Sequence, residues 1–284
     1  MPVTKVENPL GFSSRSATAT AQIGNLRRGT PVYDFTWRGK SAHADFGIDT
    51  LKIGSTVIAE RRDNAYTIAG RSGLVHNQDG AVEEVERQLT IYLPYEQGRA
   101  VAPFSEIRAW LKGYGQLTLS TIPDRYMLAY ITDQIALDPI IEGYADRKGT
   151  VIFRCAPYLY HTGVEEETLL EPRVLQNPGT AQSQPIITVN ATGDVDLMIG
   201  TQSVLLTGLT GQIIIDSAIE EAYGCDENGE LVNLSNHMAG DFPILPTGSV
   251  PINWSASDGD DEEEGSMPGT VTSIVIQPNW RDEN

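Results

Sequence analysis

Glycine repeatedly interrupts an alternation of apolar and polar residues in the first third of this chain. The pattern is clearest in three stretches: 35–40 (FTWRGK), 45–48 (DFGI) and 66–73 (YTIAGRSG). Alternation with a period of two is typical of strands with one buried face, and glycines favour the tight turns between such strands. Residues 51–58 and 87–93 continue the alternation. We therefore predict half-buried strands joined by turns here, with a turn at 70–73.

One segment, 103–112 (PFSEIRAWLK), has helical periodicity instead. Its apolar residues share one helix face: Phe104, Ile107, Trp110 and Leu111. Gly113 follows as a C-terminal stop. We predict one short helix whose apolar face is buried against a sheet.

The pattern changes near Pro157, because proline disfavours the continuation of a central strand. Beyond it, short apolar runs separated by turns indicate strands at 185–189, 195–199, 203–206, 212–216 and 272–277. Little of this half reads as helix, which favours an antiparallel sandwich or jelly roll. We predict a mainly β chain with a lead-in arm at 1–30, a first β domain at 31–157 and a second at 158–284.

The net charge of −18 is concentrated in the second half. Residues 1–155 hold 18 basic and 17 acidic residues, whereas 156–284 hold two basic residues, Arg173 and Arg281, against 21 acidic ones. A bias confined to one half indicates two domains with different surroundings. It also argues against nucleic acid as a partner, because phosphates would be repelled.

Six acids crowd into residues 258–265 (DGDDEEEG), between strand-like pieces at 250–254 and 271–276. Like charges stay apart in water, so we expect an exposed hairpin tip without bound metal. Calcium is the functional alternative, but the spacing of the acids is not that of an EF-hand loop.

The residue pattern gives no support for catalysis. The histidines, at 43, 76, 161 and 237, lack metal-ligand spacing, and no nucleophile elbow or phosphate loop is present. Two free cysteines are expected, Cys155 buried and Cys225 near the surface. We therefore expect no enzyme activity, and no catalytic, cofactor-binding or metal-binding residue and no cofactor are assigned.

Two features bear on where the protein is made. No apolar run approaches the ~18 residues that a membrane-spanning helix needs. The first residues, MPVTKVE, lack the apolar core of a signal peptide. We expect synthesis in a cytoplasm and no insertion into a membrane.

Several short motifs follow one another along nearly the whole chain. In the first half they are FTWRG (35–39), DFGI (45–48), IAGRSG (68–73), PDRY (123–126) and FRCAPY (153–158). In the second half they are NPGT (177–180), GDFP (240–243), PTG (246–248) and PNWR (278–281). Their order resembles the distal tail proteins (Dit) of siphophages and related prophage tail components. Residues 1–30 and 258–265 depart from the pattern.

This resemblance implies an N-terminal β-sandwich carrying one short helix and a C-terminal galectin-like sandwich similar to carbohydrate-binding modules. It further implies a structural protein of the virion tail tip, a homo-hexameric ring. Its partners would be the tail tube protein, the tail-associated hub protein and the receptor-binding or baseplate proteins. The near-neutral first half is expected to form the ring and the acidic second half to point outward. The motif positions report fold, and no binding residue is carried over.

Two other functions remain open at this point. A carbohydrate-binding module for host cell-wall glycans would need exposed aromatic residues in a groove of the second domain. A glycan-cleaving enzyme would need a placed pair of carboxylates, for which the sequence gives no positive support.

Overall fold

The computed structural model describes residues 33–55, 57–77, 80–94, 102–132, 134–140, 146–225, 229–256 and 269–284. The chain divides into two units, one running up to Tyr158 and including Asn284, the other comprising Leu159–Glu283. It thus passes from the first unit to the second after Tyr158 and returns for Asn284. The segments 1–30 and 258–265 that the sequence singled out lie outside the described residues.

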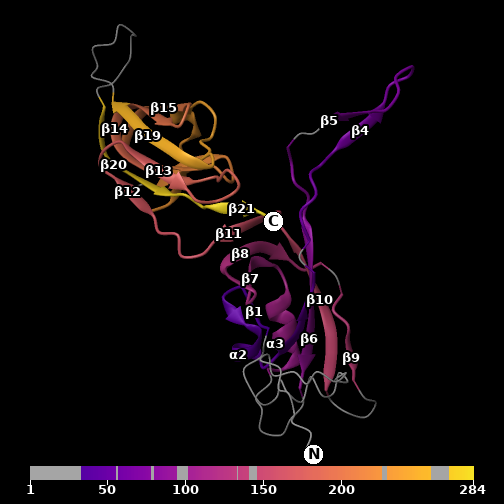
Figure 1. Ribbon diagram of the computed structural model, residues 1–284. Coiled ribbons are helices and arrows are strands. Elements are labelled where there is room, and N and C mark those ends of the chain that lie inside the picture. The colour runs from indigo at the N-terminus through magenta and orange to yellow at the C-terminus, as the bar shows by residue number, and fades with distance from the viewer. Residues whose placement is uncertain are drawn as a thin grey trace, which may run out of the picture. The chain divides into compact units, whose positions relative to one another are not determined.

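The first unit is built on one antiparallel sheet (Figure 1). Its strands, in spatial order, are β2 (Lys40–Ser41), β1 (Phe35–Trp37), β7 (Tyr114–Leu119), β8 (Ile122–Tyr130), β10 (Arg147–Cys155), β6 (Val85–Leu93) and β3 (Asp49–Ile53). β9 (Leu137–Pro139) adds to β10. Tyr33, which lies just before β1, forms a β-bridge with Thr50 of β3. The two edges of the sheet therefore approach each other.

Helix α3 (Phe104–Leu111) supplies the centre of an aromatic core. Trp110 stacks on Phe46 and Phe35, with ring centroids 4.1 and 5.6 Å away. Phe153 of β10 meets Trp37 edge-on at 5.1 Å. The two tryptophans also exchange hydrogen bonds: the Trp110 indole N–H donates to the Trp37 carbonyl at 2.8 Å, and the Trp37 indole N–H donates to the Trp110 carbonyl at 3.0 Å. These contacts fasten helix α3 to β1 and to Phe46, and they join β1 to β10.

The prediction for this helix is confirmed except at its first residue. Ile107, Trp110 and Leu111 are buried, and Gly113 follows the helix with φ of +94°, a conformation that glycine adopts without strain. Phe104, predicted on the buried face, is 50% exposed. It begins the helix, and the Arg108 guanidinium lies over its ring at 5.9 Å.

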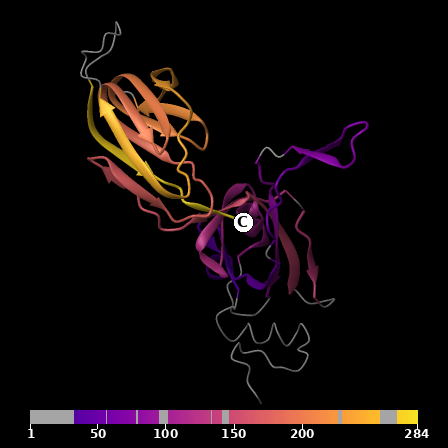
Figure 2. The same cartoon turned by 45° about the horizontal axis from the view of Figure 1, so that its top comes forward.

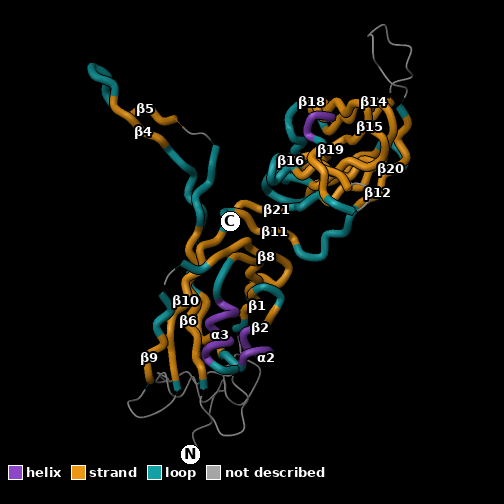
Figure 3. The backbone as a smooth tube through the Cα atoms, turned by 180° about the vertical axis from the view of Figure 1, so that it is seen from behind, coloured by secondary structure: helices purple, strands orange, loops and turns teal. Residues whose placement is uncertain are grey.

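A second helix, α2 (Ala42–Phe46), was not predicted (Figure 3). The pattern of 45–48 predicts strand and turn; the strand is wrong at Asp45 and Phe46, which are helical, whereas Gly47 ends the helix with φ of +68°. The Ser41 hydroxyl accepts from the Ala44 amide at 2.9 Å, while the Asp45 carboxylate accepts from the Ser41 amide at 2.7 Å. This reciprocal cap stabilises a helix of five residues, too short to show a helical repeat in sequence.

The second unit is a nine-stranded antiparallel sheet folded over one core. Its strands are β12 (Glu167–Leu169), β13 (Arg173–Asn177), β14 (Ile186–Ile199), β15 (Gln202–Asp216), β16 (Glu221–Cys225), β17 (Leu231–Asn233), β18 (Met238–Ala239), β19 (Gly248–Ala256) and β20 (Thr270–Gln277), with a 3₁₀ turn η1 (Ser235–His237). β11 (Tyr158–His161) and β21 (Arg281–Glu283) pair with each other.

Two long strands replace the four short ones predicted over 186–216. β14 and β15 form one hairpin with a register shift between Gly193 and Val195. At the shift, the Asp194 carboxylate accepts from the Gly208 amide at 2.7 Å. Before it β14 pairs with β20, and after it β14 pairs with β19. Because a bulge bends a strand, the two halves of this hairpin can belong to two layers that share one core.

The sequence predicted that the strands on either side of 258–265 form a hairpin, and this prediction is wrong. In the described residues, β19 pairs with β13 and β14, and β20 pairs with β12 and β14. The two strands pair with different halves of β14 and not with each other. The broader prediction of a mainly β chain with antiparallel, sandwich-forming sheets is confirmed.

Candidate assembly surface

A long hairpin leaves the sheet of the first unit between β3 and β6. We call its described residues, 57–77 and 80–83, the arm, which is separate from the lead-in at 1–30; its strands are β4 (Asn64–Thr67) and β5 (Leu74–Asn77). Within the described residues, these two strands pair only with each other. In Figures 1 and 2 the arm runs away from the other strands of its own unit. No other strand of the part that the structure describes therefore covers the arm.

The tip of the arm is a glycine turn, as the sequence predicted. Thr67 pairs with Leu74, and between them Gly70 and Gly73 take φ of +81° and +87°. The amide of Arg71 donates to the carbonyl of Ile68 at 3.1 Å. Positive φ is costly for other residues, so the glycines of this motif set the shape of the arm.

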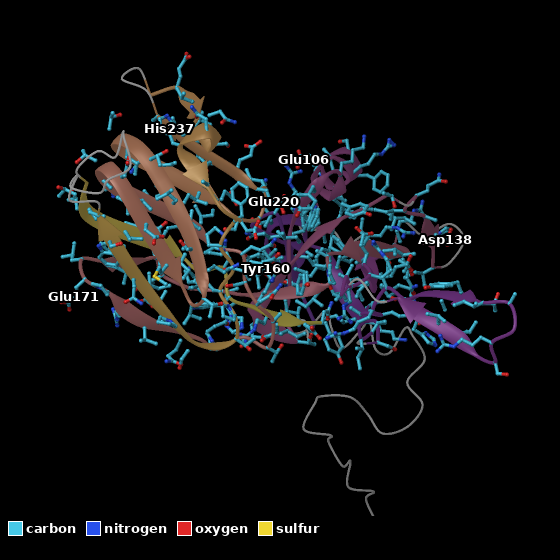
Figure 4. All side chains as sticks on the ribbon, turned by 90° about the horizontal axis from the view of Figure 1, so that it is seen from above. Glu106, Asp138, Tyr160, Glu171, Glu220 and His237 are labelled. Carbon is cyan, nitrogen blue, oxygen red and sulfur yellow. The ribbon has the colours of Figure 1, made fainter. Side chains whose placement is uncertain are left out.

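Large apolar side chains are exposed along the arm. They are Val57 (46% exposed), Ile58 (83%), Tyr66 (51%), Ile68 (45%) and Leu74 (52%). Figure 4 shows the side chains extending from both edges of the hairpin. An isolated two-stranded hairpin is marginally stable in water, and contiguous exposed apolar residues mark interaction sites. The arm is thus a candidate surface for binding another chain.

The base of the arm is closed by hydrogen bonds between its two limbs. The Arg62 amide donates to the Ala81 carbonyl and the Glu83 amide to the Glu60 carbonyl, both at 2.8 Å. The Arg62 side chain also pairs with the Glu83 carboxylate at 2.8 Å. The arm therefore begins as a two-stranded ribbon before β4 and β5.

A cleft of about 550 Å³ lies at this base, lined by residues of both limbs and of β6. Four carboxylates line it, those of Glu60, Glu83, Glu84 and Glu86, with Lys52 as the basic residue. Glu84 accepts a hydrogen bond from the Tyr130 hydroxyl at 2.7 Å, and this bond raises the pKa of Tyr130. Glu86 pairs with Arg154 at 3.1 Å. The cleft is thus acidic, but three of its four carboxylates already have partners, because Glu83 pairs with Arg62.

The histidines do not assemble a catalytic or metal site in the described residues. His43 contacts Asp49 at 3.0 Å and His161 contacts Asp282 at 3.1 Å, while His76 contacts Asp63. His237, on η1 at the surface in Figure 4, contacts the carbonyl of Thr207. Within the described ranges, no group of three or more histidine, cysteine, aspartate or glutamate side chains could hold a metal ion.

Both cysteines are free, with Cys155 buried and Cys225 exposed as expected. Burial raises the pKa of the Cys155 thiol to about 12, and nearby Arg87 opposes that shift only in part. A thiol with such a pKa is not a nucleophile near neutral pH.

The described part of the second unit exposes no aromatic side chain strongly. The strongly exposed aromatic side chains of the described residues are Tyr66, Phe104 and Tyr114, all in the first unit. Tyr160, labelled in Figure 4, is half-buried on β11. Strongly exposed aromatic residues, which would favour a carbohydrate-binding module, are therefore not found in the described part of this unit. No helix in the described ranges has the length and apolar character to cross a membrane.

In comparisons of sequence, no protein family and no curated protein matches this chain. Comparison with solved structures does find a match: the crystal structure of SPP1 Dit, described as a paradigm of the hub adsorption apparatus in phages that infect Gram-positive bacteria. The match covers 89% of this chain and 99% of SPP1 Dit, with a TM-score of 0.59 and 15% identity.

The fold is that of a Dit protein. The match extends over most of both chains, so it includes both units of this protein. At 15% identity it establishes the fold alone. The resemblance that short motifs indicated in the sequence is thereby confirmed at the level of fold.

Proposed function

We propose that this protein is a structural component of a phage tail tip, a Dit-type hub in which six copies form a ring. The fold shared with SPP1 Dit over 89% of the chain is the observation that carries the proposal. The protein would act without catalysis, in the virion, after synthesis in the host cytoplasm.

In this proposal the first unit forms the ring. A ring uses head-to-tail contacts, in which one surface of a copy binds a different surface of the next. The arm fits this role because it extends from its own unit and exposes apolar side chains such as Ile58 and Tyr66. The first half of the chain is also almost neutral, so copies of it approach with little repulsion.

The acidic second unit would point outward from the ring. Six copies of a domain with 21 acids and two basic residues resist crowding, which favours separation of these units. We infer a galectin-like sandwich here. The ring would bind the tail tube protein on one side, and the tail-associated hub protein and the receptor-binding or baseplate proteins elsewhere.

Molar mass in solution tests the proposal. Light scattering should give six times the chain mass of 31.0 kDa, alone or with tail tube protein added. Replacing two exposed apolar residues of the arm, as in the double variant Tyr66→Asp/Leu74→Asp, should leave monomers. The control Leu231→Asp changes a residue of the second unit that is 73% exposed and should still form rings.

Two results would contradict the proposal. Wild-type protein that stays monomeric even with tail tube protein would exclude the ring. Arm variants that assemble as well as the control would exclude the arm as the contact between copies.

A further inference from the structure

Arg87 is a buried cation at the base of the arm. Arg87 lies on β6 and is 4% exposed, and burial lowers the pKa of its guanidinium. The guanidinium donates to the main-chain carbonyls of Ser55 at 3.3 Å and Val57 at 3.4 Å, and to the side-chain oxygen of Asn284. Within the described residues it has no carboxylate partner. A buried charge held only by neutral acceptors depends on each of them.

Asn284 is the second half of this arrangement. It belongs to the first unit, although it follows β21 directly in the chain. Its main-chain carbonyl accepts from the Ala59 amide at 2.8 Å, and its own amide donates to the Pro157 carbonyl at 3.1 Å. With the Arg87 bond, Asn284 therefore ties together the start of the arm, β6 and the chain before β11.

These ties converge on one short segment. Ser55, Val57 and Ala59 are alternate residues where the chain leaves β3 and enters the arm. Arg87 holds the first two and Asn284 holds the third. Exposed contacts between the two sides of the arm, such as the Arg62–Glu83 pair, hold these sides together. They do not attach the arm to β6.

Two buried hydrogen-bond donors of Arg87 and Asn284 lack acceptors in the described part of the chain. Arg87 Nε and Asn284 Nδ2 are both buried and have no hydrogen-bond acceptor among the described residues. Buried donors without partners cost free energy, so the contact is weaker than its number of bonds suggests. Opening the contact would let water reach these donors, which lowers the free-energy cost of opening.

We propose that Arg87 and Asn284 form a latch that fixes the direction in which the arm leaves the first unit. The latch closes when Asn284 seats on Arg87 and Ala59, and opens when Asn284 withdraws. Because Asn284 is covalently continuous with β21, a displacement of β21 acts directly on the base of the arm.

Hydrogen exchange of the monomeric protein at low concentration tests the latch without reference to ring assembly. Asn284→Ala and Arg87→Met should each raise exchange at least tenfold in peptides covering 57–62, and leave β14 and β15 unchanged. The double variant should exchange no faster than Arg87→Met alone, since both changes open the same contact. Arg62→Met is the matched control. It removes an exposed ion pair at the same base and should change exchange less than twofold.

Unchanged exchange at 57–62 in Asn284→Ala would overturn the proposal, and so would an equal rise in the Arg62→Met control. If Arg87→Met does not fold, Asn284→Ala decides alone, because it opens the latch and keeps the guanidinium. A failure of ring assembly with faster exchange at 57–62 in Asn284→Ala would contradict the proposed function and leave the latch supported.

Discussion

Replacing Trp110 should destabilise the first unit selectively. The side chain is 8% exposed, stacks on Phe46 and Phe35, and donates to the carbonyl of Trp37. Deleting a buried tryptophan side chain costs about 3–5 kcal/mol. Trp110→Ala also leaves the carbonyl of Trp37, a fully buried residue, without its indole donor. The loss of this donor costs about 1–3 kcal/mol, so we expect the total loss of stability near the upper end of the range for a buried tryptophan.

Trp110→Phe separates the two contributions. Phenylalanine can stack in place of the indole but has no N–H, so it removes the hydrogen bond and keeps much of the apolar contact. We expect a loss of about 1–3 kcal/mol in the free energy of unfolding for Trp110→Phe. The order of stability should be wild type, then Trp110→Phe, then Trp110→Ala.

Hydrogen exchange followed by mass spectrometry is the suitable assay, because it reports the two units separately. The slowest amides of β7 and β10 exchange through unfolding of the first unit. Since ~1.4 kcal/mol corresponds to a factor of ten, Trp110→Ala should speed them by about two to four orders of magnitude. Amides of β14 and β15, in the second unit, should keep their wild-type rates.

A cost below about 1 kcal/mol for Trp110→Ala, well under the range for a buried tryptophan, would show that the indole contributes little to this core. Equal losses in Trp110→Ala and Trp110→Phe would show that the hydrogen bond, and not packing of the indole, holds the helix. Faster exchange in β14 and β15 as well would show that the two units do not unfold independently.

Three further predictions concern single residues or segments. Iodoacetamide at pH 8 should label Cys225 and spare Cys155, because burial raises the pKa of Cys155 to about 12; labelling of both in native protein would contradict this. Asn177→Ala should cost at least about 2 kcal/mol in urea unfolding of the second unit, since its buried amide donates to three main-chain carbonyls; a cost near zero would show that other donors replace it. Calcium should not change the melting temperature, whereas a rise of several degrees that a Gly-Ser replacement of 258–265 abolishes would establish a cation site there.

Local patterns in the sequence were sufficient for much of this fold. Alternation identified the strands, because side chains on a strand point to its two faces in turn. The apolar spacing of Ile107, Trp110 and Leu111 placed α3, and Gly113 marked its end. The glycines at 70 and 73 predicted the turn at the tip of the arm. Each of these features depends on residues within a few positions of one another, so the sequence carries it directly.

Other features could not be predicted from the repeat pattern of the residues. Helix α2 is too short for periodicity and forms where Ser41 and Asp45 cap it. Nothing in the alternation of 57–77 indicated that this hairpin would leave its sheet, because a strand has the same pattern whether or not a sheet covers it. The tie between Arg87 and Asn284 spans 197 positions. The sequence determined the mainly β character of the chain, helix α3 and the turn at the tip of the arm. The tertiary structure alone decided which surfaces remain exposed and which distant polar groups meet, because burial is set by the packing of the whole chain.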